Sequence, residues 1–306
     1  MQTMAPLYGF GGGGGTGASL TVNAPAGCTV TVSKDGKTKT KTAGADGVAV
    51  FRGLATGQWT VNMTDGVQTA PAKTADITAD YAITMSFFSA TIHVTYPAGS
   101  TCTATDGVTT LTAPDTSGTW DCVVPNAGVW TVSLDSGFAE AVEVTTNGET
   151  YMVDKWYLYN RGDEHTSLTG GWSNSGWKQG NSTTLAPVKN SDNIQVITNS
   201  SNYPTVAGVS NAIKLSGFSK ISVKAIIDQH GIYGGILLSC DLEVSMAKTV
   251  NISSNTIASV SMGAASTSIV QKDIALDNTV DYAYVGIYSE TIRGNKGRFF
   301  EIWLEV

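Results

Sequence analysis

The sequence predicts an all-β protein in which two small tandem β-sandwiches precede a larger one. Three observations support this: an internal repeat at an offset of about 71 residues, short alternating segments between glycine-rich turns, and a change of sequence character after Asp154. Glycine supplies 34 of 306 residues, as expected where tight turns join short strands. We expect an N-terminal arm at 1–18, sandwiches at 19–88 and 89–153, and a C-terminal domain at 154–306.

The arm contains Leu7-Tyr8-Gly9-Phe10 followed by five glycines. A glycine-rich chain is a flexible coil unless something holds it. We expect Tyr8 and Phe10 to anchor the arm in a neighbouring protein. A disordered tether is the alternative.

The two small sandwiches share one pattern, between residues 24–61 and 96–132. Six positions of the first copy match the second: Pro25, Asp35, Gly47, Phe51, Gly57 and Trp59 align with Pro97, Asp106, Gly118, Cys122, Gly128 and Trp130. Strands are predicted where apolar residues alternate, at Leu20 and Val22, Val30 and Val32, Val48 and Val50, and Trp59 and Val61, with 81–88 closing the first unit. The two tryptophans are expected to fill the sandwich cores.

Two Asp-Gly steps, Asp35-Gly36 and Asp65-Gly66, lie between alternating runs. They predict type I′ hairpin turns, in which both central residues have positive φ. The Gly-x-Trp-Thr-Val element that begins at Gly57 and again at Gly128 resembles the closing strand of PEGA-like and carboxypeptidase-regulatory-like sandwiches of bacterial surface and phage proteins. That resemblance covers 19–153 and implies an Ig-like spacer fold without catalytic residues.

The cysteines are sparse for a secreted disulfide scaffold of this length: Cys28, Cys102, Cys122 and Cys240. Cys102 and Cys122 take the positions of apolar Val30 and Phe51 in the first repeat, so both should point into the core and could face each other. Two buried thiols, typical of a reducing cytoplasm, or a disulfide are both open.

The C-terminal domain is long enough to bury one full core as a single sandwich. Strands are predicted at 172–178, 194–199, 221–227, 236–243, 257–262, 268–276, 282–288 and 298–304. Several are nearly continuous apolar runs, as expected for inner strands of two packed sheets, and we predict a jelly roll. The aromatic-rich ends of the domain, 156–159 and 300–304, are expected to pair as neighbouring strands.

The opening LYNRGDEHTSLTGGW of this domain and its ending, Tyr-Val-Gly-Ile followed by Glu-Ile-Trp-Leu, resemble C-terminal jelly-roll domains of modular virion proteins from phages and prophages of Gram-positive gut bacteria. The stretch LYGFGGGGGTGASLTV is similar to the start of the same class. The resemblance implies a structural protein of a phage particle, assembled in the host cytoplasm and joined to other virion proteins through the arm. A tail fibre or baseplate receptor-binding protein is the leading expectation; a capsid decoration protein or head fibre is the alternative.

The net charge and the distribution of apolar residues argue against nucleic acid and membranes as partners. The formal net charge is −7 and the pI is near 4.9, which leaves no basic face for nucleic acid. No apolar run approaches the roughly 18 residues that span a bilayer, and the N-terminal stretch lacks signal-peptide order. We expect no nucleic acid, no membrane insertion, and a homo-oligomer. Tyr282, Tyr284 and Tyr288 share one strand face that suits an aromatic platform or an oligomer interface.

The sequence gives little indication of catalysis. His93, His165 and His230 lie at no metal-ligand spacing, and we predict no cofactor and no metal. There is no Gly-x-Ser-x-Gly motif, and the acidic residues of the third domain are expected to be surface carboxylates, so we predict a non-enzymatic protein. A glycan-cleaving tail enzyme is the least favoured alternative. Arg161-Gly162-Asp163 predicts a turn, and Asp163 with Glu164 could help to hold a structural Ca²⁺.

Aromatic residues in polar surroundings are the best functional indication. Trp172, Trp177 and Tyr203 lie in Gly-, Ser- and Asn-rich segments that cover an aromatic ring poorly. Sugars pack their C–H faces on exposed rings while polar side chains bind their hydroxyls. We predict a glycan site at these three residues with Asn174 and Asp192. The alternative is that the tryptophan rings face the core.

Overall fold

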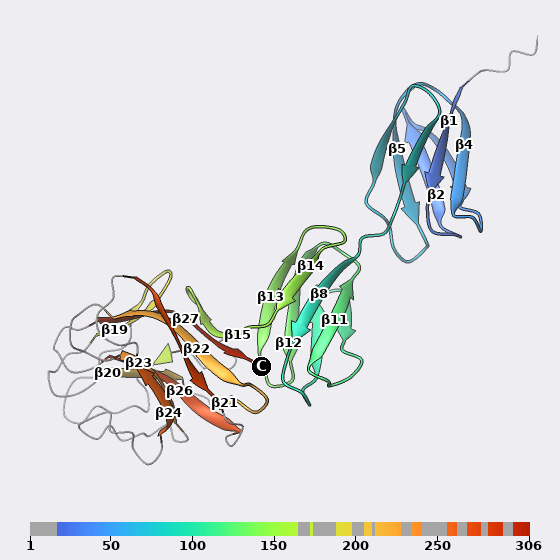
Figure 1. Cartoon of the computed structure of the whole chain (residues 1–306). Helices are drawn as coiled ribbons and strands as arrows, with labels where there is room; N and C mark the ends of the chain where they lie inside the picture. Colours follow the sequence, from blue (N-terminus) through green and yellow to red (C-terminus); the bar gives the residue numbers. More distant parts are fainter. Residues whose placement is uncertain are drawn as a thin grey trace, which may run out of the picture. The chain divides into compact units, whose positions relative to one another are not determined.

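The chain is all-β, as predicted. The computed structural model describes residues 17–164, 172–173, 188–197, 205–209, 212–227, 234–239, 256–261, 268–276, 281–289 and 296–306. Every regular element in these ranges is a strand. The same residues contain no helix long and apolar enough to cross a membrane. The chain divides into two compact units, Met1–Ser89 and Ala90–Val306 (Figure 1). The first division lies one residue from the expected boundary, whereas the boundary expected after residue 153 falls inside the second unit and stays a prediction.

The described part of the first unit is a sandwich of two sheets, ordered β4-β1-β7 and β3-β2-β5-β6. β1 pairs antiparallel with β4 and parallel with β7. The strands are β1 (Ala18–Asn23), β2 (Thr29–Lys34), β3 (Lys37–Thr42), β4 (Val48–Leu54), β5 (Gly57–Thr64), β6 (Lys73–Ile77) and β7 (Tyr81–Thr84).

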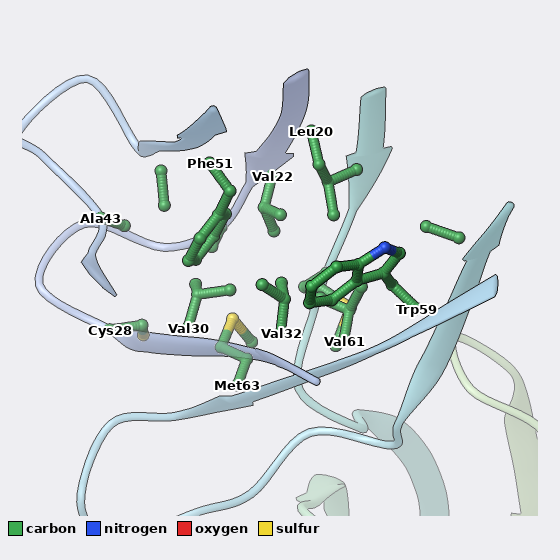
Figure 2. Packing of buried hydrophobic residues seen from close by; sticks show 14 of the residues in the cluster. Leu20, Val22, Cys28, Val30, Val32, Ala43, Phe51, Trp59, Val61 and Met63 are labelled. Carbon is green, nitrogen blue, oxygen red and sulfur yellow. The ribbon is translucent and has the colours of Figure 1, made fainter. Parts of the chain in front are cut away.

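Alternating side chains of both sheets form the core of this sandwich (Figure 2). Trp59 is buried, as predicted, and its ring N–H donates to the carbonyl oxygen of Ala55 at 2.9 Å. Phe51 lies in the core, as its match to Cys122 predicted, and the valines that marked this strand lie on the other face. Ala49 and Phe51 fill the core while Val48 and Val50 are only half-buried, because successive side chains of a strand point to opposite faces.

β3 has no buried residue and was not predicted from the alternation. It is placed by its ladder with β2 and by its lysines. Lys39 Nζ donates to the carbonyl oxygens of Arg52, at 2.9 Å, and Gly53, at 3.3 Å. Lys41 Nζ donates to Val50 O at 2.6 Å. The ammonium groups of β3 therefore bind backbone acceptors of β4, in the other sheet.

The two Asp-Gly turns differ. Asp35 and Gly36 have φ of 49° and 74°, which confirms the positive values predicted for a type I′ hairpin. At Asp65-Gly66 only the glycine has positive φ, so the type I′ prediction is wrong there. Asp65 Oδ1 accepts hydrogen bonds from the backbone N–H groups of Val67, at 2.8 Å, and Gln68, at 2.6 Å, and these bonds shape a longer loop.

The second unit begins with a sandwich that repeats the first strand for strand. Its sheets are ordered β11-β8-β14 and β10-β9-β12-β13, and β8 again pairs antiparallel with one neighbour and parallel with the other. The strands are β8 (Ala90–Thr95), β9 (Cys102–Thr105), β10 (Thr110–Thr112), β11 (Thr119–Val124), β12 (Gly128–Leu134), β13 (Ala139–Val144) and β14 (Thr150–Val153). The predicted internal repeat is confirmed.

Equivalent residues of the two repeats have the same structural role. Trp130 is buried like Trp59 and donates from its ring to Asn126 O at 3.1 Å. Gly47 and Gly118 both have positive φ, and a Cβ there would lie 2.8 Å from Ala24 O and 3.0 Å from Tyr96 O respectively. Only glycine fits such a position without strain.

Cys102 and Cys122 are buried free thiols on opposite sheets of the second sandwich. Burial raises the pKa of each to about 12, and the charge of Cys122 contributes to the shift at Cys102. The sequence left two buried thiols or a disulfide open, and the structure has two buried thiols.

The remainder of the second unit forms two antiparallel sheets, stacked in Figure 1. One contains β15 (Trp156–Asn160), β16 (Asp163–Glu164), β18 (Val188–Lys189), β19 (Ile194–Ile197), β22 (Lys220–Ile227), β25 (Val270–Ala275) and β27 (Lys296–Glu305). The other contains β17 (Trp172–Ser173), β20 (Thr205–Val209), β21 (Ile213–Lys214), β23 (Gly234–Ser239), β24 (Thr256–Ser261) and β26 (Tyr282–Ser289). Each of the eight predicted strands has a counterpart here, the first of them described only at its two initial residues.

The aromatic ends of this region pair, as predicted. β15 runs antiparallel to β27, with Trp156 opposite Leu304 and Tyr157 opposite Trp303. β27 also pairs with β22 along its length and with β19 at its start. This central strand therefore brings the beginning, middle and end of the region into one sheet.

Candidate functional site

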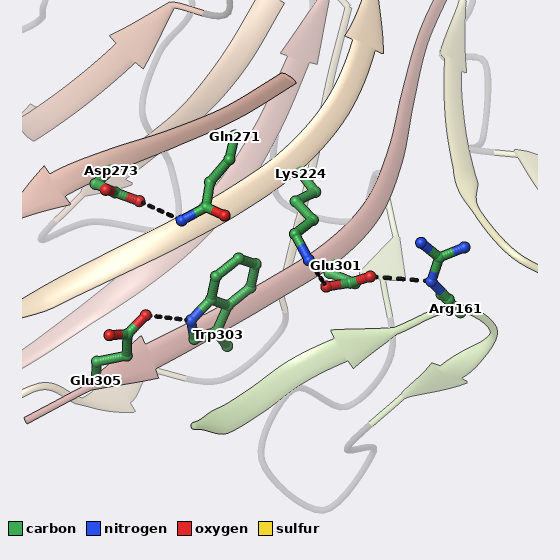
Figure 3. Close-up of polar contacts among 7 residues, drawn as sticks. All are labelled: Arg161, Lys224, Gln271, Asp273, Glu301, Trp303 and Glu305. Atoms are coloured by element: carbon green, nitrogen blue, oxygen red, sulfur yellow. Dashed lines mark hydrogen bonds and ion pairs between the residues drawn. The ribbon is translucent and has the colours of Figure 1, made fainter. Parts of the chain in front are cut away.

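A charged face lies on the sheet formed by β15, β22, β25 and β27. Along β27 the apolar side chains of Ile302 and Leu304 lie in the core, so Glu301, Trp303 and Glu305 point to the opposite face. Lys220 and Lys224 of β22 join them there. Figure 3 draws most of these groups with Arg161, which follows β15. We call this set of residues the charged face.

Glu301 is the centre of the charged face. Its Oε1 lies 2.9 Å from Arg161 Nε, and its Oε2 lies 2.6 Å from Lys224 Nζ (Figure 3). Burial raises the pKa of Glu301, but the hydrogen bonds from Lys224 and Arg161 outweigh burial and leave the pKa below its usual value. The carboxylate thus stays ionised and orders two cations. The Arg161 side chain is still 50% exposed and that of Lys224 29%, so both can reach a ligand.

Trp303 supports the charged face from beneath. Its ring N–H donates to Glu305 Oε1 at 2.6 Å, and the ring of Tyr157 lies 5.9 Å from it, centroid to centroid. The ammonium groups of Lys155 and Lys224 lie 5.0 and 5.2 Å from the ring centroid, within cation–π range. Trp303 is only 1% exposed, so it positions cations and does not itself offer a stacking surface.

Tyr157 and Glu301 each keep one protonation state near neutral pH. Burial, with the charges of nearby Glu301 and Glu140, raises the pKa of Tyr157 to about 12, and the phenol stays protonated at neutral pH. Glu301 stays ionised. A general acid or base works best when its pKa is near the working pH, and neither group meets that condition.

An aromatic junction fixes the charged face to the second sandwich. Phe138, from the sandwich, contacts Phe218 and Trp156 edge-on, with ring centroids 5.4 and 6.4 Å apart. The three rings are buried, and Trp156 Nε1 donates to Thr95 O at 2.9 Å. At Gly217, a Cβ would lie 2.5 Å from the Cβ of Pro97, so this contact also requires glycine.

Glu140 is an ionisable residue at this junction. It lies on β13, and its Oε1 accepts a hydrogen bond from the backbone N–H of Tyr157 at 2.5 Å. Burial raises the pKa of Glu140 to about 8, against the lowering effect of the Tyr157 hydrogen bond. At neutral pH the side chain is therefore mostly protonated.

Most of the predicted glycan site lies outside the described side chains. Trp172 lies on β17, where its backbone pairs with Val209, but its side chain is not described. Asn174, Trp177 and Tyr203 lie outside the described residues, as do Tyr8 and Phe10 of the arm.

Asp192 is the member of that set with a described side chain. It is exposed and accepts a hydrogen bond from Asn193 Nδ2 at 2.7 Å. The predicted site as a whole stays a prediction.

The Arg161-Gly162-Asp163 tripeptide forms the predicted turn. Arg161 and Gly162 have φ of 43° and 107°, and a Cβ on Gly162 would lie 2.5 Å from Ser191 O. Glu301 holds the arginine, so Arg161 of this tripeptide belongs to the charged face. The Glu164 carboxylate of the suggested calcium pair lies 2.8 Å from Lys189 Nζ.

His93 lies on the outer face of β8. Ile92 and Val94 on either side of it are buried, while His93 is half-buried and its Nδ1 lies 2.5 Å from Asp121 Oδ1. Across the described residues, no group of three or more His, Cys, Asp or Glu side chains could hold a metal ion.

The charged face was missed by sequence reasoning. Arg161 and Glu301 are 140 residues apart, and no local pattern joins them. One signal was available: Glu301 and Trp303 alternate with the apolar residues of a strand already predicted to pair with 156–159. A carboxylate within an apolar, paired strand is expected to be buried, and a buried carboxylate almost always pairs with a cation.

No family model matches the chain, and no match was found among curated proteins. Solved structures give weak likenesses. GBS52, a minor pilin of Streptococcus agalactiae, is 13% identical, with 44% of this chain and 93% of that chain covered and a TM-score of 0.28. A carbohydrate-binding module of the β-sandwich superfamily is 14% identical, with 82% and 93% covered and a TM-score of 0.28. A streptococcal ancillary pilin is 9% identical, with 86% and 96% covered and a TM-score of 0.23. Similarities this weak establish neither a family nor an activity.

Proposed function

We propose that this chain is a non-enzymatic virion protein that displays a binding domain for a bacterial surface glycan, in a tail fibre or baseplate. The virion assignment rests on the sequence resemblance of the arm and of the C-terminal domain. The binding assignment rests on one observation: Arg161 and Lys224 converge on Glu301 with their side chains still partly exposed.

This arrangement supplies oriented donors at low entropic cost. Flexible arginine and lysine side chains normally lose rotamer freedom when they bind, but here an ion pair and ring contacts already restrict them. Hydroxyl and acidic groups of an envelope polysaccharide are suitable acceptors. The Phe138 junction holds this face on a repeat sandwich, as a display protein requires.

The test uses the full chain with wall polysaccharide extracted from Gram-positive gut bacteria. We expect weak binding, with a monovalent dissociation constant in the high micromolar range at best, because a shallow face buries little area. Arg161→Ala and Lys224→Ala should weaken it, whereas Lys37→Ala on exposed β3 should not. Equal binding by all three variants would reject the charged face as the site.

Labelling the protein on intact particles tests the virion assignment. Label at the tail supports the proposal. Label over the capsid rejects the tail assignment in favour of a decoration protein, and no label on particles rejects the virion role. Release of reducing ends from the polysaccharide would reject the non-enzymatic assignment.

A further inference from the structure

A cavity of about 240 Å³ lies at the junction beside the charged face. Its walls combine β13 and β14 of the second sandwich with β15 and the residues that precede it. Pockets for drug-sized ligands measure about 300–1,000 Å³. A cavity below that range has room for one small ring and not for a chain of several.

The lining offers one apolar wall and several polar groups. Met152 and Val142 form the apolar part, and Met152 is 59% exposed. Asn160, Lys155 and Glu140 supply hydrogen-bond donors and acceptors. A pyranose has the same division, a C–H face and a rim of hydroxyls.

The charges favour a neutral ligand. Asp154 and Lys155 carry opposite charges in the same lining. Burial raises the pKa of Glu140 to about 8, so its carboxyl is mostly uncharged at neutral pH and can donate as well as accept. The net charge of the lining is then close to zero, which gives an anionic ligand such as a phosphate no advantage.

Two of the polar groups are already held in place. The Tyr157 backbone N–H fixes the Glu140 carboxyl, and the Trp303 ring lies 5.0 Å from Lys155 Nζ. The lining is therefore partly organised before a ligand arrives, which reduces the entropy lost on binding.

We propose that this cavity binds a single neutral hexose ring at the end of a surface glycan chain. The inference rests on the proposed glycan-binding function and adds a second subsite, beside the charged face, with its ligand class. Residues of the second sandwich and of β15 are both needed, so the complete chain must be used.

To test this, the full chain is titrated with the methyl pyranosides of glucose, galactose and mannose. Binding is measured by calorimetry and by the NMR signal of the Met152 methyl group. At least one hexoside should bind and shift that methyl resonance. Met152→Ser and Asn160→Ala should each weaken binding about tenfold, through loss of the apolar wall or of an amide hydrogen bond. Val123→Ser is the matched control, because Val123 is also 59% exposed and lies on the same sheet as Met152.

The results separate this inference from the proposed function. If no hexoside binds, or if Met152→Ser behaves like Val123→Ser, the cavity is not a sugar site, even if the chain still binds wall polysaccharide through the charged face. If a hexoside binds with the expected variant pattern while no wall fraction does, the cavity inference stands and the envelope-binding function is rejected.

Discussion

The raised pKa of Glu140 makes the stability of the second unit depend on pH. The ordinary pKa is 4.5 and the folded value is about 8, so the folded state holds its proton more tightly than the unfolded state. Stability from this group is fully present below about pH 4.5 and is lost as the pH rises through about 8. The variant Glu140→Gln should remove this loss.

The magnitude follows from the two pKa values. Each pH unit between 4.5 and about 8 is worth about 1.4 kcal/mol, which sets a ceiling of about 5 kcal/mol. Water entering the cavity beside the carboxylate reduces that ceiling, and we expect about 1 to 3 kcal/mol. The amide introduced by Glu140→Gln stays neutral and keeps an oxygen for the Tyr157 N–H, so the variant should match the native protein at pH 4.5 and exceed it at pH 8.5.

The assay combines urea unfolding at several pH values with hydrogen exchange at the Tyr157 amide, which reports this junction directly. Unfolding of the two units need not be one step, and the exchange measurement assigns the transition to the second unit. Glu143→Gln, an exposed position of the same strand, is the control and should leave the pH dependence unchanged. If Glu140→Gln gains no more stability at pH 8.5 than at pH 4.5, the carboxyl is not held neutral and the reasoning is wrong.

Three further predictions concern the sandwiches. Trp59→Ala should cost about 3–5 kcal/mol of unfolding free energy in the first unit, because it empties a large buried site; a wild-type melting temperature would show that the ring does not fill the core. Gly47→Ala should cost about 1–3 kcal/mol, because φ is +72° and the new Cβ meets Ala24 O, and a neutral result in urea unfolding would contradict the strain. Cys102 and Cys122 should resist a thiol reagent at pH 8 and react in denaturant, since burial raises both pKa values to about 12; rapid reaction of the folded protein would count against this.

Sequence reasoning succeeded where a residue has a local reason for its place. Trp59 and Trp130 occupy the same position in the two repeats, each within a run of alternating apolar residues. The Asp35-Gly36 turn needs positive φ at both of its residues. These constraints act over a few residues and are visible in the chain. The pairing of 156–159 with 300–304 was also predictable, because aromatic ends of one domain have few other places to be buried.

The failures have a different physical origin. β3 has no apolar face, and only its hydrogen bonds to β2 and β4 define it. The contacts of Glu301 depend on β22 and β15 flanking the same strand, which the topology decides. The alternating Val48 and Val50 marked β4 as a strand but not its core face, which Ala49 and Phe51 form.

The lysines of β3 affect how closely copies of this chain can be packed without aggregation. An exposed sheet edge normally offers free carbonyl groups to a strand of another molecule, which can add itself to the sheet. On β4 the carbonyl oxygens of Val50 and Arg52 already accept from Lys41 and Lys39. A neighbouring copy would have to displace two charged donors before it could recruit this edge. Many copies can therefore be packed at high local density without strand exchange through this edge of the first sandwich.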